Sequence, residues 1–240
     1  MTATVGLDIS DVIRTFPTFR VALVVAEGLV LRDERPHDLD RVIRDAESRI
    51  AAGLAAADLA DVPELRSWRE AYKAFGVKKT SYRSSVERLL KNVQRGAGLP
   101  RVNALVDAYN TISALHRMPI GADDLDRVTP PLTFRYGRPG DTFIALGDPA
   151  AEPDPPKPGE VVYADAEKCL CRRWNWYQDA RSAVGPQTTR AVLTVQTLSA
   201  DEAQVRAAAA ELVEMINRYA GGPAAWDIAD AARPKVGVSV

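Results

Sequence analysis

The segment CLCRRWNWYQD, residues 169–179, brings together side chains that could stack on a flat ligand and neutralise its charge. On an extended strand, alternate residues share a face. One face would carry Leu170, Arg172, Trp174 and Trp176, and the other Cys169, Cys171, Arg173 and Asn175. Indole rings stack on bases and guanidinium groups bind phosphate, so the first face could hold a nucleic acid. The alternative is that both tryptophans fill the core, with the arginine stems packed beside them.

The same segment contains the only two cysteines of the chain, Cys169 and Cys171. Two positions apart on a strand, they lack the geometry for an easy disulfide, which fits a reducing compartment. The chain has two histidines, His37 and His116, and neither a CxxC pair nor an HExxH motif. We therefore expect no metal site. We expect no cofactor either, because no GxGxxG or GxxxxGK phosphate motif occurs.

Positive charge is concentrated in residues 66–101, which hold ten Lys or Arg against two Glu, a local balance of 10 − 2 = +8, in a chain whose formal net charge is −1. Such a basic region on an acidic body would attract a polyanion to one side. Lys78, Lys79 and Arg83 precede a predicted helix start, where exposed amides suit a phosphate. The alternative is that these residues merely solvate helix faces.

A second polar pattern lies in the predicted helix beginning near residue 99. Asn103, Asp107 and Asn110 follow one another at i, i+4 and i+7, so they form a stripe along one helix face. Asparagine is a poor helix former, so two of them within a helix need a reason. They could hydrogen-bond neighbouring loops or line a pocket.

The elements that must position these residues follow from periodicity. Helices are predicted over 38–60, 64–76, 84–96, 99–119 and 199–219, and capping boxes pair Ser84 with Glu87 and Ser199 with Glu202. A strand or hairpin is predicted over 19–31, and further strands over 132–137, 141–147, 160–165, 168–176 and 190–198. The proline-rich stretch 147–159 is expected to be a surface loop. We expect one domain over 1–240.

The N-terminus does not resemble a secretory signal sequence, which would have a basic segment followed by an apolar one. No apolar run approaches the length of a membrane span. We therefore expect a cytoplasmic protein without membrane contact.

Several motifs carry a family resemblance. LPRVNALVDAYN, GEVVYAD and RRWNW, within a match over about 64–198, resemble the freestanding B3/B4 domain proteins. These are relatives of the editing and tRNA-binding domain of the phenylalanyl-tRNA synthetase beta subunit. The resemblance implies an α+β fold with a mixed β-sheet flanked by helices. It also implies a pocket that, in the synthetase, admits a mischarged aminoacyl-tRNA end and hydrolyses the ester. This chain departs from the pattern at Gly121, where the bacterial synthetase has histidine, and has no clear counterpart of the pocket glutamate.

The resemblance and the polar patterns together give a set of expected site residues. Catalytic or pocket hydrogen-bonding roles are expected for Asn103, Asp107, Asn110, Glu160 and Thr188. Substrate-binding roles are expected for Asp165, Trp174 and Asn175. Binding of tRNA phosphates is expected for Lys78, Lys79, Arg83, Arg172 and Arg173.

Three functions are consistent with these residues and with the family resemblance. The first is a trans-editing aminoacyl-tRNA deacylase that binds the aminoacylated 3′ end of tRNA, with a synthetase as a further candidate partner. The second is a non-catalytic tRNA or RNA-binding module. The third is a protein that binds a free amino acid or a related small molecule.

Overall fold

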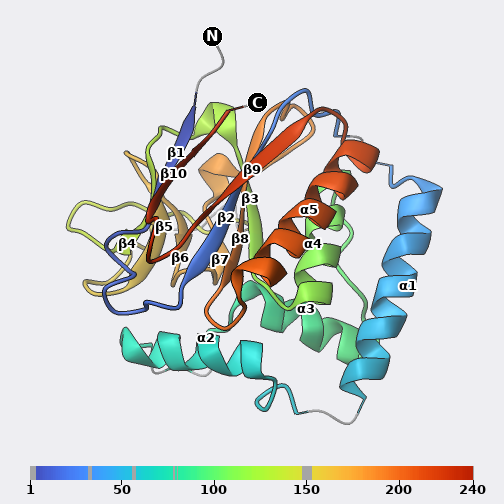
Figure 1. The fold of residues 1–240 in the computed structure, drawn as a ribbon, viewed down its shortest axis with the longest axis horizontal. Coiled ribbons are helices and arrows are strands. Elements are labelled where there is room, and N and C mark those ends of the chain that lie inside the picture. The colour runs from blue at the N-terminus through green and yellow to red at the C-terminus, as the bar shows by residue number, and fades with distance from the viewer. Residues whose placement is uncertain are drawn as a thin grey trace.

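The computed structural model describes residues 4–31, 34–55, 58–77, 79, 81–147 and 153–239, and its strands form two sheets beside a group of helices (Figure 1). The six-stranded sheet has the order β10-β1-β4-β5-β6-β7. Its strands are β10 (Lys235–Val238), β1 (Val5–Asp8), β4 (Leu132–Tyr136), β5 (Val161–Ala164), β6 (Cys169–Arg172) and β7 (Tyr177–Gln178). The sheet is mixed, because β1 and β4 are parallel whereas the other neighbours are antiparallel.

The four-stranded sheet has the order β3-β8-β2-β9 and is antiparallel. Its strands are β3 (Ile120–Asp124), β8 (Ala191–Thr197), β2 (Arg20–Ala26) and β9 (Ala224–Ala229). The central strand β2 is apolar on both faces. Val21, Leu23 and Val25 face the six-stranded sheet, whereas Ala22 and Val24 face the helices. The four-stranded sheet is therefore the middle layer of the molecule.

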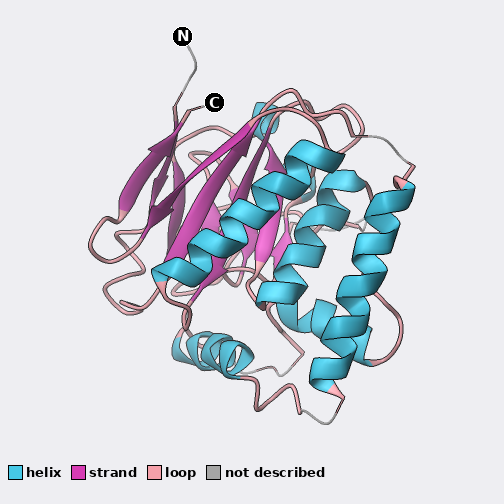
Figure 2. Ribbon diagram, turned by 45° about the vertical axis from the view of Figure 1, so that its right-hand side comes forward, coloured by secondary structure: helices cyan, strands magenta, loops and turns pink. Residues whose placement is uncertain are grey.

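Five α-helices lie in the described part of the chain, and Figure 2 shows most of them gathered to one side of the sheets, with one helix below the strands. They are α1 (His37–Leu54), α2 (Pro63–Ala74), α3 (Ser85–Gln94), α4 (Ala104–His116) and α5 (Glu202–Tyr219), and two short 3-10 turns span Leu125–Arg127 and Ala180–Ser182. Helices α4 and α5 cover the four-stranded sheet, and α1 and α3 pack on α4. No helix in the described ranges combines the length and apolar character needed to cross a membrane.

The α+β class is confirmed, but several local predictions are wrong. The strands form two stacked sheets rather than one, and residues 141–147 make only an isolated bridge at Ala145. Ser84 makes no side-chain cap, and the capping box of α5 joins Asp201 to Gln204 instead of Ser199 to Glu202. Strands β1, β3, β7, β9 and β10 were not predicted.

The strand predicted over 168–176 also ends early, at Arg172. Arg173 and Trp174 have φ angles of 47° and 67°, a left-handed conformation that residues other than glycine rarely adopt. The alternation of faces stops there, and the chain turns back into β7. The predicted common face of Leu170, Arg172, Trp174 and Trp176 therefore does not form.

Candidate functional site

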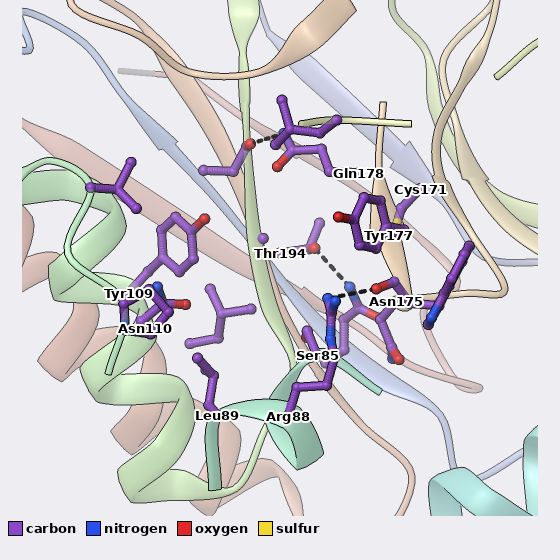
Figure 3. Close-up of a pocket in the computed structure, with 18 of the residues that line it drawn as sticks. Ser85, Arg88, Leu89, Tyr109, Asn110, Cys171, Asn175, Tyr177, Gln178 and Thr194 are labelled. Atoms are coloured by element: carbon purple, nitrogen blue, oxygen red, sulfur yellow. Dashed lines mark hydrogen bonds between the residues drawn. The ribbon is translucent and has the colours of Figure 1, made fainter. Parts of the chain in front are cut away.

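A cavity of about 660 Å³ lies at the edge strand β3, between the two sheets and the helices α3 and α4 (Figure 3). The four-stranded sheet contributes Gly121, Asp123, Thr194 and Gln196, and the six-stranded sheet contributes Tyr163, Leu170 and Cys171. Helix α3 contributes Arg88 and Leu89, and α4 contributes Tyr109 and Asn110. This volume lies within the range of about 300–1,000 Å³ that is typical of small-ligand sites.

The absence of a side chain at Gly121 keeps part of the cavity open. A Cβ added at this glycine would meet no atom within 4 Å, although its strand partner Thr194 lines the same cavity. Glycine weakens a strand interior because it has no side chain to pack. At this position it leaves space for a ligand.

A hydrogen-bonded chain of polar side chains forms one wall. The Tyr72 hydroxyl donates to Asn175 Oδ1 over 2.9 Å, and Asn175 Nδ2 donates to Gln196 Oε1 over 3.2 Å. Gln196 Nε2 in turn donates to Thr194 Oγ1 over 2.9 Å. Such a connected network fixes the orientation of each amide, so the wall presents a defined pattern of donors and acceptors to a ligand.

The acidic group of the cavity is Asp123, whose side chain is nearly inaccessible at 4% exposure. Burial raises its pKa from 3.8 to about 7, although hydrogen bonds from Ser182 and Gln178 act in the opposite direction. Ser182 Oγ donates over 2.6 Å and Gln178 Nε2 over 3.1 Å, both to Oδ1. Among the described residues, these bonds leave Oδ2 available to a ligand. A carboxyl with this pKa can exchange a proton near neutral pH.

The thiol of Cys171 also lines the cavity, but burial raises its pKa. It therefore stays protonated at neutral pH and is a poor nucleophile. Within the described ranges, no three His, Cys, Asp or Glu side chains gather in a metal-binding cluster.

Positive charge borders the cavity along α3. Arg88, Lys91 and Arg95 line it from the solvent-exposed side of the helix, while Val86 and Leu90 face the core. Arg88 Nη2 donates to the carbonyl of Trp176 over 2.8 Å, which holds the guanidinium 5.1 Å from the ring centre of Tyr177.

Two of the expected site residues, Asn110 and Asn175, line this cavity. The other members of the predicted α4 stripe have structural partners. Asn103 caps α4 by accepting from the Val106 amide. Asp107 is buried and accepts from Arg35 Nε over 2.8 Å and from the Val102 amide.

Arg172 does not bind phosphate at the surface, which corrects the prediction. Its side chain is 0% exposed, and it donates from Nε and Nη2 to the two carboxylate oxygens of Glu160, each over 2.9 Å. Its Nη1 donates to the carbonyl of Asp154. Because the donors point at these partners inside the protein, Arg172 and Glu160 form a buried structural pair, and Glu160 does not line the cavity.

Trp174 and Arg173 are also buried, contrary to prediction. Trp174 is 0% exposed and packs edge-on against Phe19 and Trp68 between the sheets, so it cannot stack on a ligand. The Arg173 guanidinium lies over the rings of Tyr82 and Trp176, at 3.7 and 4.3 Å from the ring centres. Since its side chain is enclosed, Arg173 is not a surface contact for phosphate.

Asp165 and Thr188 lie outside the cavity lining. Asp165 accepts from Lys168 Nζ over 2.7 Å and from the Thr129 amide, so it stabilises a turn. Thr188 donates to Asp124 Oδ2 over 2.7 Å. The expectation that they hold substrate is therefore not supported by their positions.

Two of the expected phosphate ligands before α3, Lys79 and Arg83, line a second cavity. Lys79 is exposed, and Arg83 forms an ion pair with Glu87 over 2.8 Å. Lys78 lies outside the described residues. Asp123, Tyr109 and Gln178 line the first cavity but are not among the expected site residues. An acid two positions after Gly121 was a usable signal for Asp123.

The chain is similar to known proteins in both sequence and fold. A family model described as the B3/4 domain matches residues 67–221. The fold is similar to that in the crystal structure of an N-terminal fragment of the phenylalanyl-tRNA synthetase beta subunit from Pyrococcus horikoshii. The TM-score is 0.50 and the sequence identity is 14%, over 93% of this chain and 51% of that fragment, so the chain spans about half the fragment's length. No curated protein matches. Because the family model covers more than half of the sequence, the chain belongs to the B3/4 domain family.

Proposed function

We propose that this protein is a trans-editing aminoacyl-tRNA deacylase, which hydrolyses the ester of a mischarged tRNA in the cavity beside β3. Membership of the B3/4 domain family supports a function related to a tRNA synthetase. The observation that carries the proposal is the placement of cationic side chains along one side of a small-ligand cavity that has one polar wall. This arrangement suits a ligand that joins a phosphate backbone to a small polar group.

The cationic side of the cavity would hold the end of the nucleic acid. Arg88, Lys91 and Arg95 follow one helix face, and contacts of such residues with phosphates give affinity without reading the base sequence. The aminoacyl group would then extend past Tyr109 and Asn110 toward the polar wall (Figure 3).

Hydrolysis requires a positioned water and an acceptor for its proton. In our proposal Asp123 accepts the proton at Oδ2 while the water oxygen attacks the ester carbonyl carbon. The bond between that carbon and the ribose oxygen then breaks, and the ribose oxygen takes up a proton. A pKa of about 7 suits a general base at neutral pH. Because an aminoacyl ester is already activated, orientation by Asn110 and Asn175 would supply much of the remaining acceleration.

The test is a panel of mischarged tRNAs incubated with the purified protein, with release of the amino acid measured against spontaneous hydrolysis. We expect excess release from at least one tRNA, and a rate constant that falls by at least about 100-fold in Asp123→Asn, a typical contribution of a general base. Binding with a steep salt dependence but no turnover on any tRNA would contradict the deacylase proposal and favour a binding module.

A further inference from the structure

The second cavity, of about 420 Å³, lies on the other side of the start of α3. It is lined by Trp68, Arg69, Tyr72 and Lys73 of α2 and by residues of the segment that leads into α3. The two cavities share a wall, because the ring centres of Tyr82 and Trp176 are 4.8 Å apart and each lines a different cavity. The consecutive residues Ser84 and Ser85 likewise line one cavity each.

Cationic side chains outnumber acidic ones in the lining of the second cavity. Arg69, Lys73, Lys79 and Arg83 line it, against the single acid Glu87. Glu87 is buried, and its Oε1 lies 2.7 Å from Arg69 Nη2 and 2.8 Å from Arg83 Nε. One carboxylate therefore fixes two guanidinium groups. Each guanidinium has five N–H donors, so both retain donors for an anion.

The start of α3 adds donors that lack partners. The Ser84 hydroxyl has no hydrogen-bond partner among the described residues, although Ser84 is only 2% exposed and lines the cavity. No side chain caps the helix. The Ser85 amide donates to the carbonyl of Asn175 over 3.0 Å, whereas the Val86 and Glu87 amides have no acceptor among the described residues. Amides in the first turn of a helix have no intrahelical acceptor and favour an anion at this end. A buried hydroxyl without a hydrogen-bond partner is unfavourable. The buried Ser84 hydroxyl is therefore explained if a ligand supplies the missing partner.

We propose that the second cavity is a phosphate-binding site, in which Ser84, the Val86 and Glu87 amides, Lys79 and the paired guanidinium groups donate to the phosphate oxygens. The site itself does not depend on the function proposed above. Only the source of the phosphate rests on that function: we assign it to the backbone of the nucleic acid whose 3′ end enters the neighbouring cavity. A free phosphate monoester has the same chemistry and is the other source.

The site is tested by calorimetric titration with inorganic phosphate. Wild type should show saturable binding, and Ser84→Ala and Lys79→Glu should each weaken it by at least about tenfold, because each removes a hydrogen bond to a charged ligand. The matched controls are Ser48→Ala and Lys157→Glu, which make the same changes outside both cavities, and they should bind as wild type does. Thermal unfolding checks that Ser84→Ala remains folded.

A second titration distinguishes the two possible sources of the phosphate. A single-stranded RNA ending in CCA is titrated against phosphate-loaded protein. Displacement of the phosphate by RNA, lost in Lys79→Glu, assigns the site to the nucleic acid backbone. Phosphate binding that RNA does not displace assigns it to a free phosphate monoester. No saturable binding of phosphate, or equal binding by Ser84→Ala, Lys79→Glu and wild type, would overturn the proposal whatever the deacylation assay shows.

Discussion

Replacing Asp123 by asparagine removes the charge of the buried carboxyl but keeps its hydrogen bonds. Ser182 and Gln178 both donate to Oδ1, and the amide oxygen of asparagine can accept from both. The substitution therefore isolates the effect of burying the charge beside the cavity.

The size of this effect follows from the pKa of Asp123. Folding raises it from 3.8 to about 7, a shift of about 3 units, and each unit corresponds to about 1.4 kcal/mol. The folded carboxyl holds its proton more tightly than the unfolded one. Its contribution to stability is therefore full below pH 3.8, is lost as the pH rises from 3.8 to 7, and does not return above that. Wild type should lose on the order of 4 kcal/mol over the whole window.

The assay is denaturant unfolding of wild type and Asp123→Asn at pH 5, 7 and 9. We expect the variant's advantage in free energy of unfolding to grow by about 3 kcal/mol from pH 5 to pH 9, most of it below pH 7. Asp45→Asn, which removes an exposed carboxylate of α1, is the matched control. A difference between wild type and Asp123→Asn that stays constant with pH would show that the carboxylate is well solvated, and would refute the reasoning.

Three further predictions concern other parts of the structure. Glu160→Gln should lower the free energy of unfolding by about 3 kcal/mol in chemical denaturation, because it leaves the buried Arg172 guanidinium with the exposed Asp154 as its one remaining counter-charge among the described residues; a loss below about 1 kcal/mol would contradict the pairing. Arg88→Glu combined with Lys91→Glu should weaken tRNA binding and make the slope of log affinity against log salt shallower by about 2, and an unchanged slope would remove α3 from the interface. Gly121→Val should leave the melting temperature equal to or above that of wild type, because the added Cβ meets no atom within 4 Å and valine favours a strand; a clear drop would mean that the space beyond the Cβ is filled.

Periodicity predicted the helices well because their buried stripes are long. The apolar side chains of α3 from Val86 to Val93 recur at helical spacing, and the structure buries them as expected. Arg88, Lys91 and Arg95 lie on the exposed side of the same stretch. What periodicity did not show was that this side borders a cavity, since the opposite walls come from β3, β8 and β6, far away in the sequence.

The predictions around residues 172–174 failed for two physical reasons. Arginine in a strand was expected to reach solvent, but Glu160 supplies two carboxylate oxygens inside the protein, and only the fold brings the two together. The left-handed conformation of Arg173 and Trp174 then reverses the chain where strand alternation was assumed. Neither residue type favours that conformation, so local sequence gave no warning.

If ester hydrolysis takes place in the cavity beside β3, as we propose, filling that cavity should slow it. The most direct test is single-turnover deacylation of one susceptible mischarged tRNA by wild type and Gly121→Val, with melting temperature and tRNA affinity measured on the same samples. Three added carbon atoms at Gly121 should lower the hydrolysis rate by at least about 100-fold, while both proteins remain folded and bind tRNA equally. Equal rates in the two proteins would place the chemistry elsewhere.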